Sequence, residues 1–172
     1  MTPDTSRGPA SAGPAFDLLA RITGVLTGAV LVALVLLVCT EAVLRGFANV
    51  SLGFAEELTG YAVVMLTFFG AALALRSGSL FQVHFLFERF APAPRRIVLR
   101  LFVVTALVIS AVLAWKGYDL MASSLSRGKF APTVLRTPLW IPQLLLPVGF
   151  LLIATFLVEQ FLLCGRTPRG ED

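Results

Sequence analysis

The stretch ITGVLTGAVLVALVLLVCT, from Ile22 to Thr40, carries no charged residue and decides the fold class. A helix needs roughly 17 to 25 mostly apolar residues to cross a hydrocarbon core of about 30 Å, and this stretch reaches that length. Three further apolar runs do the same: Leu58 to Leu75, Ile97 to Trp115 and Leu139 to Val158. The sequence therefore predicts four transmembrane helices.

Composition supports an all-α integral membrane protein. Hydrophobic residues make up 57% of the chain, and its mean hydropathy is +0.86; a soluble domain is less apolar. A transmembrane β-barrel would show shorter segments of alternating polarity, whereas these runs are continuous. Residues 1–16 are rich in Pro, Gly, Ser and Ala and predict a disordered tail. Residues 17–165 then form the membrane domain, and 166–172 a second short tail.

The loops differ in positive charge, which predicts the orientation of the chain. Five of the 14 Lys and Arg residues belong to the first and third loops and their flanks: Arg45, Lys116, Arg127, Lys129 and Arg136. The other nine belong to the two tails, the second loop and their flanks. By the positive-inside rule both termini and the second loop are cytoplasmic. The net charge of +4 then reflects topology, and no nucleic-acid partner is predicted.

The loops and the fourth run carry three further expectations. In residues 80–90 apolar side chains recur with a helical period while polar ones, including His84, fall mostly opposite, which predicts a helix at the lipid boundary. The third loop, from Lys116 to Pro138, is long enough to offer a surface to a partner. Pro147 lies within the fourth run and should kink that helix.

Small residues at helical spacing predict faces where helices approach closely. Gly24 and Gly28 form one such face in the first run. In the third run Ala106, Ser110 and Ala114 form another. Gly70 and Ala74 share a face over one turn of the second run. Small-residue faces in three of the four runs indicate a bundle that packs on itself and on a further protein.

The predicted membrane interior is uncharged. Residues 22–40, 58–75, 101–114 and 139–158 contain no Asp, Glu, Lys, Arg or His. Proton relays and ion pathways within membranes usually use such residues, so an autonomous ion-coupled carrier is disfavoured. The single His and the two distant cysteines, Cys39 and Cys164, suggest no cofactor, metal site or catalytic set. The sequence gives no sign of an enzyme.

Four segments follow one another along the chain in a characteristic order and spacing. They are Arg45 after the first run, SLGFAEEL with Glu56 and Glu57, FFGAALALRSG with Gly70, Arg76 and Gly78, and PLWIPQLLLPVGF with Pro147 and Gly149. In this order and spacing the chain resembles the small membrane subunit of tripartite ATP-independent periplasmic (TRAP) transporters. One stretch departs from the family pattern: Leu80 stands where the family has His, and His84 where it has Asp.

The resemblance implies a function for the chain in the bacterial inner membrane. In this family a periplasmic binding protein delivers an organic anion to a membrane complex, in which a large permease subunit carries the substrate and coupling-ion sites. The small subunit braces the large one. Two alternatives remain at this point: a scaffold or assembly protein of another complex, or an autonomous small transporter or enzyme. The resemblance implies eight candidate subunit contacts: Arg45, Glu56, Glu57, Gly70, Arg76, Gly78, Pro147 and Gly149.

Glu56 and Glu57 allow two interpretations. Both occupy the first turn of the second predicted helix, where the helix dipole favours negative charge. Alternatively, one of them pairs with Arg45 across the first loop, or with a basic residue of the large subunit. In either case they lie at the outer surface of the membrane.

Overall fold

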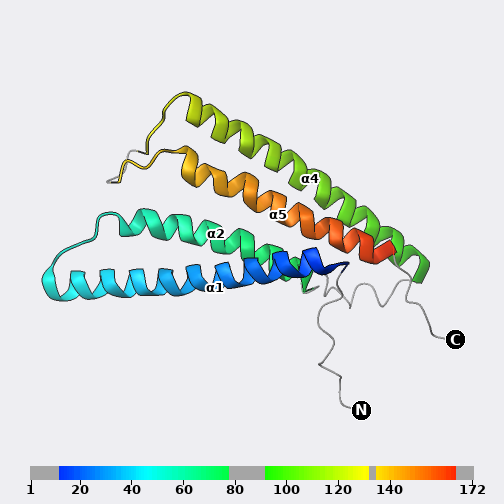
Figure 1. Ribbon diagram of the computed structural model, residues 1–172, viewed down its shortest axis with the longest axis horizontal. Coiled ribbons are helices and arrows are strands. Elements are labelled where there is room, and N and C mark those ends of the chain that lie inside the picture. Colours follow the sequence, from blue (N-terminus) through cyan, green and yellow to red (C-terminus); the bar gives the residue numbers. More distant parts are fainter. Residues whose placement is uncertain (1–11, 78–91, 132–134, 166–172) are drawn as a thin grey trace, which may run out of the picture.

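The computed structural model describes residues 12–77, 92–131 and 135–165 and has four long helices (Figure 1). These are α1 (Pro14–Val43), α2 (Ala55–Arg76), α4 (Pro92–Ser126) and α5 (Trp140–Gly165), and a π-helical turn, η1 (Leu44–Ala48), continues α1. Each of the four is long and apolar enough to cross a membrane. The prediction of an all-α protein with four transmembrane helices is confirmed.

Four expectations fall outside the described residues. They are the structure of residues 1–11, the helix at 80–90 with Leu80 and His84, the contact at Gly78, and the tail 166–172.

The helices extend beyond the apolar runs that predict them. α1 begins at Pro14, a residue favoured in the first helical turn because its missing N–H would have no partner there. Asp17 follows in the same turn, where the helix dipole favours a carboxylate. Hydropathy marks where lipid ends, whereas a helix continues for as long as its backbone hydrogen bonds do. The same reasoning explains why α4 begins at Pro92, ahead of the apolar run.

The third loop is shorter than the sequence predicts. α4 continues through Lys116 to Ser126, so the expected loop of Lys116 to Pro138 is wrong over its first half. Gly128 follows with a φ of +57°, a left-handed conformation that commonly ends a helix. A bridge between Phe130 and Pro138 then closes the remaining loop.

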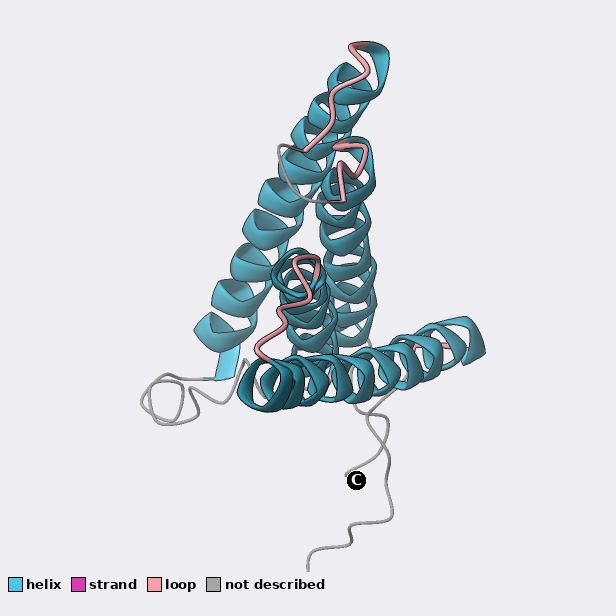
Figure 2. Ribbon diagram, turned by 90° about the vertical axis from the view of Figure 1, so that its left-hand side faces the viewer, coloured by secondary structure: helices cyan, strands magenta, loops and turns pink. Residues whose placement is uncertain are grey.

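The helices pack in the order α1, α2, α5, α4, so that sequence neighbours α1 and α2 form one pair and α4 and α5 another (Figure 1). The pairs meet through α2 and α5. Figure 2 shows the helices diverging rather than running parallel. They converge at the end that carries Pro14 and Gly165, here called the terminal end (Figure 1). The main core cluster comprises Ala20, Ala72, Leu75, Val103, Phe156 and Leu157.

Most of the helical surface faces outward. In the most apolar window of the first span, 6% of the residues are buried within the chain. In a membrane the rest must be covered by lipid or by another protein. The chain alone therefore presents a large apolar surface, and its helices contact one another mainly within each pair, above all between α4 and α5.

Candidate functional site

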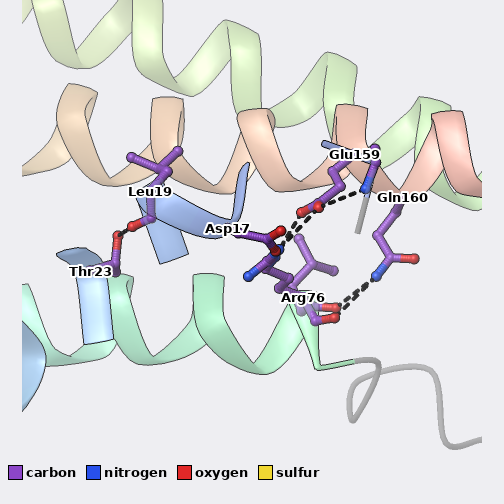
Figure 3. Close-up of polar contacts among 8 residues, drawn as sticks. Asp17, Leu19, Thr23, Arg76, Glu159 and Gln160 are labelled. Carbon is purple, nitrogen blue, oxygen red and sulfur yellow. Dashed lines mark hydrogen bonds and ion pairs between the residues drawn. The ribbon is translucent and has the colours of Figure 1, made fainter. Parts of the chain in front are cut away.

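Polar side chains from three helices meet at the terminal end (Figure 3). Arg76, the last residue of α2, donates from Nε to Glu159 Oε2 of α5 at 2.9 Å and from Nη2 to Oε1 at 3.3 Å. The same Nη2 binds the Asp17 carboxylate of α1. We call Asp17, Arg76 and Glu159 the terminal cluster; it connects α1, α2 and α5.

The surroundings of the terminal cluster fix its geometry. Glu159 is 1% exposed, and the Arg76 guanidinium lies 5.8 Å from the centre of the Phe156 ring. The Ala12 backbone N–H donates to Glu159 Oε1 at 3.3 Å. Gln160 Nε2 donates to the carbonyl oxygens of Leu75 at 3.2 Å and of Arg76 at 3.5 Å, two of the acceptors that the end of α2 leaves open.

The terminal cluster makes Arg76 an internal contact of this chain. A guanidinium with a two-point contact to one carboxylate and a further bond to another has strong, directional, charge-assisted hydrogen bonds. Because Glu159 is buried, loss of Arg76 would leave its charge uncompensated. The structure shows that Arg76 connects α2 to α1 and α5 through Asp17 and Glu159. Its role as a contact to another subunit stays a prediction.

A second polar group lies at the opposite end, which carries the first and third loops and is here called the loop end. Glu57 Oε1 accepts hydrogen bonds from the Tyr61 hydroxyl and from Thr137 Oγ1, each at 2.5 Å. Tyr61 lies one turn further along α2, whereas Thr137 comes from the loop before α5. Glu57 thus ties the two helix pairs together, while Glu56 is exposed.

Arg45 has a different partner from the one considered in the sequence analysis. Its guanidinium lies 3.7 Å from the Glu41 carboxylate, one turn earlier in the helix, and donates to Ser51 at 3.2 Å. Glu41 also accepts from the Ser51 hydroxyl at 2.7 Å and from the Leu52 N–H at 2.8 Å. The pairing of Arg45 with Glu56 or Glu57 is therefore wrong: Glu41 is nearer in the chain and holds the first loop.

The two polar ends are about one membrane thickness apart. Glu57 and Arg76 are separated along α2 by about 28 Å at a rise of 1.5 Å per residue. Asp17 and Glu41 are separated along α1 by about 36 Å on the same basis. A hydrocarbon core measures about 30 Å. Both sets of ionised groups can therefore lie near headgroups while the apolar middle spans the lipid.

Among the predicted contact residues that are glycines, Gly149 is the most closely packed. A Cβ built there would lie 2.4 Å from Cγ of Phe68, so α2 and α5 approach too closely for a side chain. The Phe68 ring also meets the Phe150 ring edge-on, with centroids 4.9 Å apart. Pro147, two residues earlier, lies inside α5, and a Cβ built at Gly117 of α4 would lie 3.2 Å from its Cδ. Pro147 and Gly149 thus both make contacts within the chain.

The small-residue faces of α1 and α4 differ in how they are packed. On α4, Ser110 and Ala114 are buried and Ala106 is partly buried. A Cβ at Gly24 or Gly28 of α1, by contrast, would meet nothing within 4 Å. The α4 face therefore packs inside the chain and the α1 face is open. Gly70 is likewise open to an added Cβ.

Comparison with known proteins identifies the group to which this architecture belongs. Residues 34–166 match the family model described as tripartite ATP-independent periplasmic transporters, DctQ component. The chain belongs to this family. The small-subunit resemblance drawn from the sequence is thereby confirmed, and the chain is a multi-pass membrane component of a TRAP transporter.

A curated relative shows the same segment within a longer protein. The chain is 27% identical over 114 residues to the isethionate TRAP transporter permease protein DctMQ of Oleidesulfovibrio alaskensis. That alignment covers 64% of this chain and 18% of the relative, so the chain spans less than a fifth of that protein's length. Within the DctQ match lie Arg76, Glu159 and Gly149, whereas Asp17, Gly24 and Gly28 precede it.

Sequence reasoning missed several residues that organise this DctQ chain. The pairing of Glu159 with Arg76 was not predicted, although Arg76 ends another helix on the same side of the membrane and carries the opposite charge. Gly117 was missed although it continues the small face of α4 three residues after Ala114. Nothing in the sequence indicated that Asp17 binds Arg76. That contact depends on α1 beginning at Pro14, well before the apolar run.

Proposed function

We propose that this chain braces the large permease component of a TRAP transporter in the bacterial inner membrane, with both termini in the cytoplasm. The complex takes up an organic anion that a periplasmic binding protein delivers, driven by an ion gradient. The observation that carries the proposal is the distribution of charge. The contacts of ionised side chains lie at the two ends of the helices, and the middle of each span carries no charge.

This distribution suits a static element better than a moving carrier. Ion pathways inside membranes usually show ionisable residues at depth, and those residues here lie near the two membrane surfaces. The terminal cluster and Glu57 tie the α1–α2 pair to α5 and its loop at opposite ends. A chain that is linked at both ends and apolar between them can support a mobile partner without moving its own charges across the membrane.

The large apolar surface also leaves room for such a partner. The matched relative is named a DctMQ permease, and the segment shared with this chain is a small part of it. That supports a permanent membrane partner for this chain, supplied as a separate or a connected polypeptide. The outward faces of α1, with Gly24 and Gly28, are the most open helix surface available to such a partner.

Purification tests the proposal. The chain, carrying an affinity tag, is expressed with the large permease component of the same transporter and purified in a mild detergent. We expect a complex of defined, constant stoichiometry by size-exclusion chromatography with light scattering. Purification of this chain free of the large component, at expression levels where both are inserted in the membrane, would contradict the proposal.

A further inference from the structure

α4 carries an outward-facing ion pair towards its loop end. Lys116 Nζ and Asp119 Oδ2 are 4.0 Å apart, and the two residues are one helical turn from each other. The Lys116 side chain is 73% exposed and that of Asp119 51% exposed. Both residues belong to Arg100–Ser126, the part of α4 that is long and apolar enough to cross a membrane. We call them the α4 ion pair.

The packing of α4 on α5 shows how deep the α4 ion pair lies. Gly117, next to Lys116, faces Pro147, since a Cβ at Gly117 would lie 3.2 Å from Pro147 Cδ. From Trp140, where α5 begins, to Pro147 the helix rises about 11 Å at 1.5 Å per residue. Asp119 lies nearer the loop end than Gly117 by about 3 Å on the same basis. The backbone of Asp119 is therefore about 8 Å below the start of α5.

The start of α5 marks the edge of the hydrocarbon at the loop end. Thr137, just before α5, donates to Glu57 in the first turn of α2, so the apolar runs of both helices begin at one level. The α4 ion pair lies inside that level, although short of the middle of the span. Helical side chains lean towards the N-terminus of their helix, which carries the Asp119 carboxylate deeper and not back to the surface.

The α4 ion pair lacks the hydrogen bonds that the terminal cluster has. Arg76 donates to Glu159 at 2.9 and 3.3 Å, whereas 4.0 Å is too long for a hydrogen bond between Lys116 and Asp119. Neither residue has another hydrogen-bond partner among the described parts of the chain. An ammonium group has three donors to satisfy, and a carboxylate has two acceptor oxygens. Lipid chains offer partners to neither group.

A protein surface suits this face of α4 better than lipid does. Charged side chains within a membrane almost always face protein or a water-filled cavity. Among the described elements α4 packs extensively only on α5, which leaves its other side open. Val108, Val112 and Trp115 are exposed there and share a helical face with Asp119. This apolar stripe with a polar pair fits a transmembrane helix whose polar side chains hydrogen-bond across the contact.

We propose that the face of α4 formed by Val108, Val112, Trp115, Lys116 and Asp119 binds a transmembrane helix of the large permease component, whose polar side chains hydrogen-bond to the α4 ion pair. This inference rests on the proposed function, which supplies the partner, and adds a surface that the partner covers. In the packing order α1, α2, α5, α4 this face belongs to the opposite edge from the open glycines of α1, so it is a separate contact.

A double substitution and a matched control test this surface in the co-expressed complex. Lys116→Leu with Asp119→Leu removes both charges and leaves an apolar face. Co-purification should weaken about threefold to tenfold, the range expected for interhelical hydrogen bonds. Lys129→Leu removes the same positive charge from the exposed third loop and should leave recovery unchanged. The melting temperature of each variant chain alone, no lower than that of wild type, confirms that the fold is intact.

Photo-crosslinking identifies what covers the face. With p-benzoylphenylalanine at Val112, one turn before the α4 ion pair, we expect an adduct with a peptide of the large component. An adduct with lipid alone, or full co-purification of the double variant, would overturn the α4 assignment while the wild-type complex persists. If the wild-type chain itself fails to associate with the large component, the proposed function falls, and this inference with it.

Discussion

The contact between Gly149 and Phe68 makes a quantitative prediction about how α2 and α5 are held together. In Gly149→Ala the new Cβ would lie 2.4, 2.6 and 2.8 Å from Cγ, Cδ1 and Cβ of Phe68. These atoms form the base of the ring, so a change of rotamer does not move them all away. The side chain or the helix must retreat by about 1 Å to reach an ordinary contact of 3.4–4 Å.

Overpacking of this kind typically costs about 1–3 kcal/mol. Alanine also stabilises a helix by roughly 0.5–1 kcal/mol relative to glycine, which partly offsets that cost. Gly70→Ala serves as the matched control, because it makes the same chemical change inside α2 where an added Cβ meets nothing. We therefore expect Gly149→Ala to be about 1–3 kcal/mol less stable than Gly70→Ala.

Unfolding of the isolated chain by SDS in mixed micelles, followed by tryptophan fluorescence, measures this difference. A double-mutant cycle with Phe68→Ala locates its cause, since that change removes two of the three closest atoms. The cost of Gly149→Ala should fall in the Phe68→Ala background. Equal stability of Gly149→Ala and Gly70→Ala, or a cost unaffected by Phe68→Ala, would refute the close packing of α2 on α5.

Three further predictions concern the ends of the helices and the open face. Arg76→Gln should destabilise the isolated chain by about 3–5 kcal/mol because it strands the buried Glu159 carboxylate, and Arg76→Met with Glu159→Leu should recover most of that loss in the same SDS titration. Thr137→Val removes one hydrogen bond to Glu57 and should cost about 0.5–1.5 kcal/mol there; no change would mean that this bond adds nothing to stability. Gly24→Leu should leave the chain's own stability unchanged but reduce recovery of the large component, and unaffected recovery would remove α1 as a contact face.

The number and type of the helices could be predicted because both depend on local composition. An apolar run of membrane length has few alternatives to a helix in lipid, since every backbone polar group must be satisfied within the segment. The residues at which the helices begin and end were harder to predict. α1 begins at Pro14 and α4 continues to Ser126, because backbone hydrogen bonding does not stop where hydropathy falls.

The polar contacts could be predicted only in part. Glu57 was singled out, but its partner Thr137 is far away in sequence and is brought near by the packing of α2 on α5. The pairing of Arg45 with Glu56 or Glu57 was considered as one possibility, but Glu41, a carboxylate one turn earlier in the same helix, was not weighed. For glycines, the sequence shows their spacing along a helix but not which residues pack against them. Gly149, which packs against Phe68, and Gly24, which is open, therefore could not be distinguished from the sequence.

Reconstituted transport tests the bracing role most directly. Liposomes are prepared with the large permease component alone, with this chain alone, and with both, and uptake of the cognate organic anion is measured in the presence of the binding protein and an ion gradient. We predict uptake with both components and none with this chain alone, with the large component alone severely impaired. Uptake by this chain alone, or full uptake by the large component without it, would contradict the account.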